Sequence, residues 1–173
     1  VSLRKGHCYS KVKRPYTRKS KVQSKGYIKS IPANKIVRYV MGDQKGNFEF
    51  KVNLVSKQDI QLRHNALESC RQVVNRNLNN KLGNDYLFRL LVYPHHVLRE
   101  NKMLAGAGAD MMQKGMQKSF GRAIGLAAQI KRGQAVFSVF VKKDKIDNAK
   151  GALKMAVPRM PGQYFIAIEE IKK

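Results

Sequence analysis

The chain has 173 residues, of which 35 are Lys or Arg and 11 are Asp or Glu, so its formal net charge is +24. Apolar residues make up 43% of the chain, which is enough for the core of one compact domain. No stretch approaches the ~20 consecutive apolar residues of a membrane span, and Cys8 and Cys70 make a poor disulfide framework. These features predict a soluble, cytoplasmic partner of a polyanion and exclude a secreted or membrane protein.

The positive charge is densest at the N-terminus, where residues 1–38 contain no acidic side chain. Such a run of like charge repels itself, so we expect an extended basic arm over residues 1–34 that becomes ordered on a phosphate-rich partner. Interleaved tyrosines add rings on which bases can stack. The residues of this region predicted to bind RNA are Arg4, Lys5, Lys11, Lys13, Arg14, Tyr16, Arg18, Lys19, Lys21, Lys25, Lys29 and Arg38.

Residues 35–173 are predicted to form a single domain that begins with two strands. Residues 35–41, which include Ile36, Val37 and Val40, are predicted as a strand, and a turn-like segment follows at residues 42–47. Over residues 48–54, apolar and polar side chains then alternate with the period of two that is typical of a half-buried strand.

A helix is predicted over residues 59–80, because apolar residues recur there at intervals of three and four. Ser56 and Asp59 match a capping box at its start. The opposite face of this helix carries Arg63, His64, Arg71 and Arg76. These four side chains could be ordinary solvated charge or clamps for phosphate, and in so basic a chain we favour contact with RNA.

A strand at residues 86–93 is stopped by Pro94 and extends over residues 95–99, and a long mobile loop is predicted at residues 101–118. This loop has no clean period and holds four of the seven Met. It is either a flexible connection or a projecting segment that contacts RNA, and we favour a segment that could project roughly 30 Å from the domain. Its predicted contact residues are Lys102, Met103, Gly106, Gly108, Met111, Met112, Lys114, Gly115, Met116 and Lys118.

In the last third of the chain, the pattern predicts a hairpin of strands 123–130 and 134–141. A helix capped by Asp144 and ending at Pro158 should follow, and then a final strand at residues 163–171. This order predicts an α+β fold in which two helices lie on one side of a mixed or antiparallel sheet. The remaining residues predicted to bind RNA are Arg99, Arg122, Lys131 and Arg132.

Catalytic and cofactor sites find little support. Gly106–Met111 begins like a dinucleotide-binding turn but lacks the third Gly. His95 and His96 would point to opposite faces of a strand, which is the wrong geometry for one metal ion. We therefore expect no enzyme, no cofactor and no metal. A free nucleic-acid-binding regulator and an RNA-processing enzyme stay open as alternatives.

Several short strings together are characteristic of one family. They are His7–Tyr9, Arg14–Thr17, Gln61–His64, Leu67–Glu68, Pro94–Lys102, Gly106–Asp110, Gly115–Met116, Ser119–Gly121 and Gly133–Gln134. With these strings the chain resembles, over nearly its whole length, the archaeal and eukaryotic ribosomal protein ten-e, the counterpart of the bacterial large-subunit protein sixteen. The lack of a C-terminal extension resembles the archaeal type.

This resemblance implies an α/β-hammerhead type of fold and a structural role in the large ribosomal subunit. The implied partners are large-subunit rRNA near the central protuberance, in the vicinity of 5S rRNA, together with neighbouring ribosomal proteins and tRNA. The segment 102–118 would correspond to the family loop that approaches tRNA. Met111 and Gln117 stand where the family usually has Arg, so we expect a less positively charged loop tip.

Overall fold

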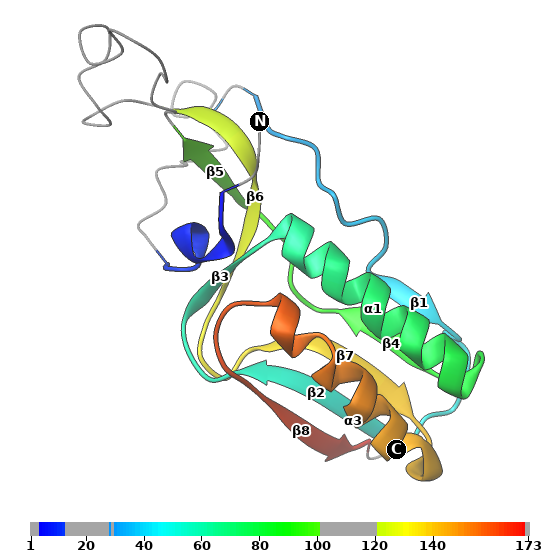
Figure 1. Ribbon diagram of the computed structural model, residues 1–173. Helices are drawn as coiled ribbons and strands as arrows, with labels where there is room; N and C mark the ends of the chain where they lie inside the picture. The colour runs from blue at the N-terminus through cyan, green and yellow to red at the C-terminus, as the bar shows by residue number, and fades with distance from the viewer. Residues whose placement is uncertain (1–3, 13–27, 29, 101–120, 172–173) are drawn as a thin grey trace, which may run out of the picture.

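The computed structural model describes residues 4–12, 28, 30–100 and 121–171, which form two antiparallel β-sheets and two α-helices (Figure 1). In order across the five-stranded sheet, the strands are β1 (Val40–Gly42), β4 (Leu87–Leu90), β7 (Ala135–Val141), β2 (Phe50–Ser56) and β8 (Tyr164–Glu170). The three-stranded sheet consists of β3 (Ile60–Arg63), β6 (Arg122–Ile130) and β5 (His96–Glu100). The predicted α+β fold is confirmed.

The two helices, α1 (His64–Leu82) and α3 (Ile146–Lys154), cover one face of the five-stranded sheet (Figure 1). Short 3-10 helices lie at η1 (Gly6–Tyr9), η3 (Lys143–Lys145) and η4 (Val157–Arg159). The apolar positions predicted for the first helix form its buried stripe, and Leu67 and Leu78 are fully inaccessible to solvent. Below them, the rings of Phe88 and Phe137 pack with their centres 5.5 Å apart. This layer is the main apolar core.

The two sheets are joined by one bent ribbon. β2 pairs with β7 in the first sheet, and their continuations β3 and β6 pair with each other in the second. At the bend, the Gly133 N–H donates to the carbonyl of Ser56 at 2.8 Å, and Gly133 has a φ of +80° that favours glycine. The predicted hairpin between residues 123–130 and 134–141 is therefore wrong, because the chain bends into another sheet instead of reversing.

The predicted start of the first helix is also wrong. Residues 60–63 form β3, whose main-chain groups pair with β6, and the helix begins at His64. Ser56 and Asp59 make no capping box: the Asp59 carboxylate accepts a 2.7 Å hydrogen bond from the Arg132 N–H, and the Ser56 hydroxyl donates to the Gln58 carbonyl. Pairing with a distant strand thus overrides the local helical pattern.

Three other strands differ from their predicted form. The predicted strand at residues 35–41 is reduced to β1, and β2 is not half-buried, because both of its faces are covered from Val52 to Ser56. Asn53 on β2 is buried and accepts a hydrogen bond from the buried hydroxyl of Ser138 on β7. The segment predicted at 86–99 divides into β4, which ends at Leu90, and β5, which begins at His96; Pro94 lies between them, and they belong to different sheets.

The C-terminal elements follow the prediction more closely. The expected final strand is confirmed as β8, and α3 follows the expected stripe, with Ala149 and Leu153 fully buried. Asp144 lies inside η3 and makes no cap for α3. No described helix is long and apolar enough to cross a membrane. The predicted loop 101–118 and the arm residues 13–27 and 29 lie outside the described residues.

Candidate nucleic-acid interface

The N-terminal segment, residues 4–12, packs against the three-stranded sheet (Figure 1). The Tyr9 hydroxyl donates a 2.6 Å hydrogen bond to Oε2 of Glu100, and Nε of Arg4 lies 2.5 Å from Oε1 of the same carboxylate. The guanidinium of Arg63 lies 5.0 Å from the centre of the Tyr9 ring, within the range of a cation–π contact. A carboxylate of the body therefore positions the beginning of the arm.

Polar contacts to β3 complete this docking. The main-chain N–H of Gln61 donates to the Ser10 carbonyl at 2.9 Å, and the Gln61 side-chain amide donates to the Tyr9 carbonyl at the same distance. Burial, together with the bond to Glu100, raises the pKa of Tyr9 to about 12. The hydroxyl thus keeps its proton and remains a donor throughout the neutral pH range.

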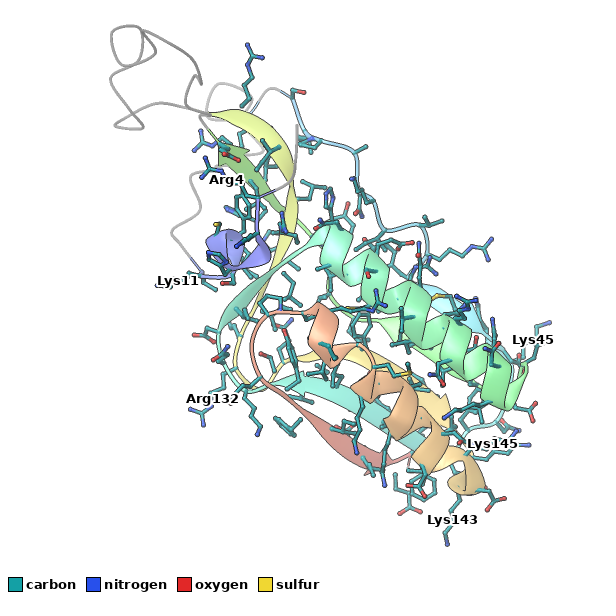
Figure 2. The ribbon with its side chains drawn as sticks, viewed as in Figure 1. Arg4, Lys11, Lys45, Arg132, Lys143 and Lys145 are labelled. Atoms are coloured by element: carbon teal, nitrogen blue, oxygen red, sulfur yellow. The ribbon has the colours of Figure 1, made fainter. Side chains whose placement is uncertain are left out.

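Many of the predicted RNA-binding residues gather on the three-stranded sheet and its edges. Figure 2 shows Arg4 and Lys11 beside this sheet and Arg132 at the bend between the sheets. The set on these elements comprises Arg4, Lys5, Lys11, Arg63, Arg99, Arg122, Lys131 and Arg132. Most of these side chains are exposed, while Arg63 and Arg99 are half-buried. The structure therefore collects residues from three distant parts of the sequence into one cationic region.

Arg71 and Arg76 on α1 do not belong to this region, and they differ from each other. The Arg71 guanidinium donates to both oxygens of Glu68, at 2.8 and 2.6 Å, and also contacts the sulfur of Met41. These hydrogen bonds hold the pKa of Glu68 below its ordinary value. Arg76 is exposed. Arg71 therefore fastens β1 to α1, and its contact with phosphate remains a prediction, as does that of the exposed Arg38.

His64 does not lie on an outer helix face, which corrects its predicted position. Its side chain is buried at the junction of β3 and α1, with 7% of its surface exposed. Burial, with the nearby charges of Lys35 and Arg63, lowers the pKa of His64. The imidazole is therefore neutral at pH 7 and lacks the charge that a phosphate contact would use.

A second cationic region was not predicted from the sequence. Figure 2 shows Lys45, Lys143 and Lys145 at the opposite end of the molecule from Arg4. Lys145 lies 2.6 Å from the carboxylate of Asp85. On the five-stranded sheet, the guanidinium of Arg89 lies 5.4 Å from the centre of the Phe140 ring. The run of lysines over 142–145 was the sequence signal for this region, whereas nothing in the local pattern indicated Arg89.

The candidates for other chemistry are separated in space. His95 is exposed and His96 is buried, so the expectation that they face opposite sides is confirmed. Within residues 4–12, 28, 30–100 and 121–171, no three His, Cys, Asp or Glu side chains are grouped as metal ligands would be. Cys8 is exposed and Cys70 is buried, and neither is in a disulfide. A basic α+β domain with two cationic ends is typical of a structural partner of nucleic acid.

Comparison with known proteins agrees with this class. The model of the family described as ribosomal protein L16p/L10e matches residues 12–167. The large ribosomal subunit protein uL16 of Methanococcus aeolicus is 45% identical over 97% of this chain and 95% of its own length. Its namesake from Sulfolobus acidocaldarius is 43% identical over 100% of this chain and 98% of its own length.

The chain is thus a ribosomal protein, a structural protein of cytoplasmic ribosomes and not an enzyme. Within that class, it belongs to the ribosomal protein L16p/L10e family. This membership confirms the resemblance that the short strings indicated.

Proposed function

We propose that this chain is a structural constituent of the large ribosomal subunit that binds large-subunit rRNA near the central protuberance and the tRNA-binding cleft. Full-length similarity to relatives named as large ribosomal subunit proteins carries the proposal. The net charge of +24 supports it, because RNA is the polyanion that such a chain meets in a ribosome. The vicinity of 5S rRNA and neighbouring ribosomal proteins belong to the same proposal.

The cationic region around the three-stranded sheet is proposed as the main rRNA contact. Arginine forms bidentate hydrogen bonds to phosphate, and Arg122 and Arg132 are exposed there. Lys13, Arg14, Tyr16, Arg18, Lys19, Lys21, Lys25 and Lys29 would continue this contact along the arm. Residues 102–118 would approach tRNA, with Lys102, Lys114 and Lys118 supplying charge near the small residues of that segment.

Subunit association tests the proposal directly. Large subunits washed at high salt should retain the protein, and subunits depleted of it should show rRNA nucleotides near the tRNA sites that become reactive to chemical probes. Unchanged reactivity at those sites would contradict the proposed location. Binding to random duplex DNA as tight as binding to rRNA, in the same salt, would instead favour a free nucleic-acid-binding regulator.

Paired charge substitutions sharpen the test. Lys131→Gln with Arg132→Gln should weaken rRNA binding and lower the log–log salt slope by about 0.7 to 0.9 for each phosphate that the protein no longer neutralises. Lys150→Gln with Lys154→Gln removes the same charge from α3, which is outside the proposed region, and serves as the matched control. Equal effects of both pairs would mean that net charge, and not this surface, governs binding.

A further inference from the structure

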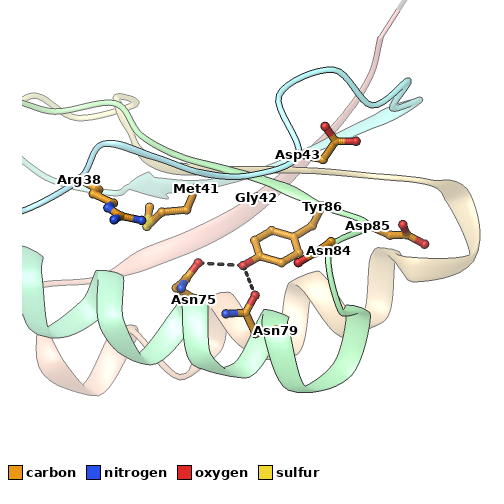
Figure 3. Close-up of a pocket in the computed structure, with 9 residues that line it drawn as sticks. All are labelled: Arg38, Met41, Gly42, Asp43, Asn75, Asn79, Asn84, Asp85 and Tyr86. Carbon is orange, nitrogen blue, oxygen red and sulfur yellow. Dashed lines mark hydrogen bonds between the residues drawn. The ribbon is translucent and has the colours of Figure 1, made fainter.

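A polar cavity of about 610 Å³ lies between β1, the second half of α1 and the turn before β4 (Figure 3). No local sequence pattern indicated it. Its size falls within the usual range of small-ligand sites. It is lined by Arg38, Met41, Gly42, Asp43, Asn75, Asn79, Asn84, Asp85 and Tyr86.

The wall between β1 and Tyr86 is tightly built. The Asp43 N–H donates a 2.8 Å hydrogen bond to the Tyr86 carbonyl. Gly42 has a φ of +88°, and a Cβ at this position would collide with the same carbonyl oxygen. Only glycine therefore permits this approach of β1. The cavity is consequently a preformed feature of the fold and not a gap between loosely packed side chains.

The floor of the cavity holds more hydrogen-bonding capacity than the protein uses. The Tyr86 hydroxyl lies 2.8 Å from Oδ1 of Asn75 and 2.6 Å from Oδ1 of Asn79 (Figure 3). A hydroxyl has one proton, so it can donate to only one of these carbonyl oxygens at a time. Each asparagine also carries an amide with two further N–H donors. The floor can thus exchange hydrogen bonds with a bound molecule in both directions.

The two ends of the cavity differ in charge. Figure 3 shows Arg38 at one end and Asp43 and Asp85 toward the other. The Asp85 carboxylate is engaged by Lys145 at 2.6 Å, and Lys45 follows Asp43 in the same turn. A bound molecule would therefore be oriented with an anionic group at Arg38 and with hydrogen-bond donors toward Asp43 and Asp85.

We propose that this cavity receives one unpaired nucleotide of RNA, turned out of its strand, with its phosphate on Arg38. Asn75 and Asn79 would bind the base edge, since an Asn amide matches the paired donor and acceptor groups of a base. The Asp43 carboxylate would accept from the ribose 2′-hydroxyl, which DNA lacks. This inference rests on the proposed function, because it names one contact within the rRNA-binding surface.

The decisive variant is Asn79→Leu, with Asn80→Leu as its matched control. Both residues are exposed on the same turn of α1, but only Asn79 lines the cavity. Asn75 remains to accept from Tyr86 in the variant, so the fold is preserved, and urea unfolding checks this. Asn79→Leu should weaken binding of the full-length protein to large-subunit rRNA about tenfold with an unchanged salt slope. Arg38→Gln should instead lower the slope by about 0.7.

Acylation of 2′-hydroxyl groups in the rRNA supplies the second measurement. One nucleotide protected by the wild-type protein should become reactive with Asn79→Leu and stay protected with Asn80→Leu. If wild-type protein binds rRNA but Asn79→Leu changes neither affinity nor any protection, the cavity proposal fails while the proposed function stands. Loss of subunit incorporation with unchanged RNA binding would assign the cavity to a protein neighbour and also overturn the proposal. If the wild-type protein itself does not bind rRNA, the proposed function fails.

Discussion

The two sheets of this protein are covered in different ways. The five-stranded sheet is covered by α1 and α3 through an apolar layer in which Leu67, Phe88 and Phe137 have no exposed surface. The three-stranded sheet adds Ile60, Leu62 and Ile130 to the same layer, and it is also covered by residues 4–12, which are held by hydrogen bonds and by the carboxylate of Glu100. Apolar burial should therefore dominate the stability of the first sheet, while salt should act mainly on the attachment of residues 4–12 to the second.

The two sheets also differ in whether the residues that cover them are suited to binding a partner. The apolar layer depends on residues that no partner needs to touch. The cover of the small sheet uses arginines and tyrosines, which are also the side chains that bind phosphate and bases. We infer that the first half supplies a rigid body and the second supplies an adjustable contact surface.

The largest effect is expected for Phe137→Ala, which leaves a cavity in the layer beneath the helices. It should lower the free energy of unfolding by about 3–5 kcal/mol, measured by urea denaturation. Phe165→Ala on β8, where the ring is 42% exposed, should cost less than about 1 kcal/mol. Similar costs for the two variants would contradict the assignment of the apolar core to the layer beneath the helices.

The next largest effect is expected for Arg71→Met, because Glu68 would lose its charged partner in a mostly buried position. The free energy of unfolding should fall by about 2–3 kcal/mol, whereas Arg76→Met on the exposed face of α1 should change it by less than about 0.5 kcal/mol. The double variant Glu68→Met/Arg71→Met should recover much of the loss. No recovery would show that the ion pair itself, and not the unpaired carboxylate, determines the cost.

The same pair predicts a dependence on acid. The pKa of Glu68 is lower in the folded protein than its ordinary value of 4.5, so the unfolded state binds more protons in this range. This contribution is complete above pH 4.5 and is lost as the pH falls through the folded pKa. Arg71→Met should flatten this part of the stability curve, as measured by urea denaturation at a series of acidic pH values.

A smaller and more local effect is expected for Tyr9→Phe, which removes only the hydroxyl that donates to Glu100. The free energy that holds residues 4–12 should fall by about 1–2 kcal/mol, and hydrogen exchange of that segment should accelerate. The unfolded pKa of 10 rises to about 12 in the fold, so the bond contributes below pH 10 and is lost as the pH rises through 12. Tyr93→Phe, which alters an exposed ring, is the control; equal exchange in both variants would contradict a role for Glu100.

The smallest effect concerns His64, whose pKa is lowered from 6.5 mainly by burial. Because the unfolded chain binds a proton more readily, stability should decrease as the pH falls below 6.5, until the folded pKa is reached. Denaturation curves at about pH 7.5 and about pH 5 should show this decrease, and it should be smaller in His64→Gln. The exposed His95→Gln should leave the decrease as it is; if it removed the decrease instead, the assignment to His64 would be wrong.

Local patterns were sufficient for much of the fold. The body of α1, the strand β8 and the stripe of α3 are readable because their residues repeat at the spacing of one regular element. The cationic character was also predictable, because the net charge is the sum of the residue charges and does not depend on the fold. For the candidate site, the sequence named Arg4, Lys11 and Arg132, but it contained no signal that Glu100 would hold the N-terminal segment.

By itself, the sequence determined the α+β class, the cationic character and the family, since each depends on residue types and their order. Only the tertiary structure decided that residues 60–63 form a strand, that the ribbon bends at Gly133, and that His64 is buried. It also decided the cavity beside Tyr86. The physical reason is that strand pairing, burial and cavities depend on residues far away in the chain, and a local pattern carries no information about which distant segment will supply the partner.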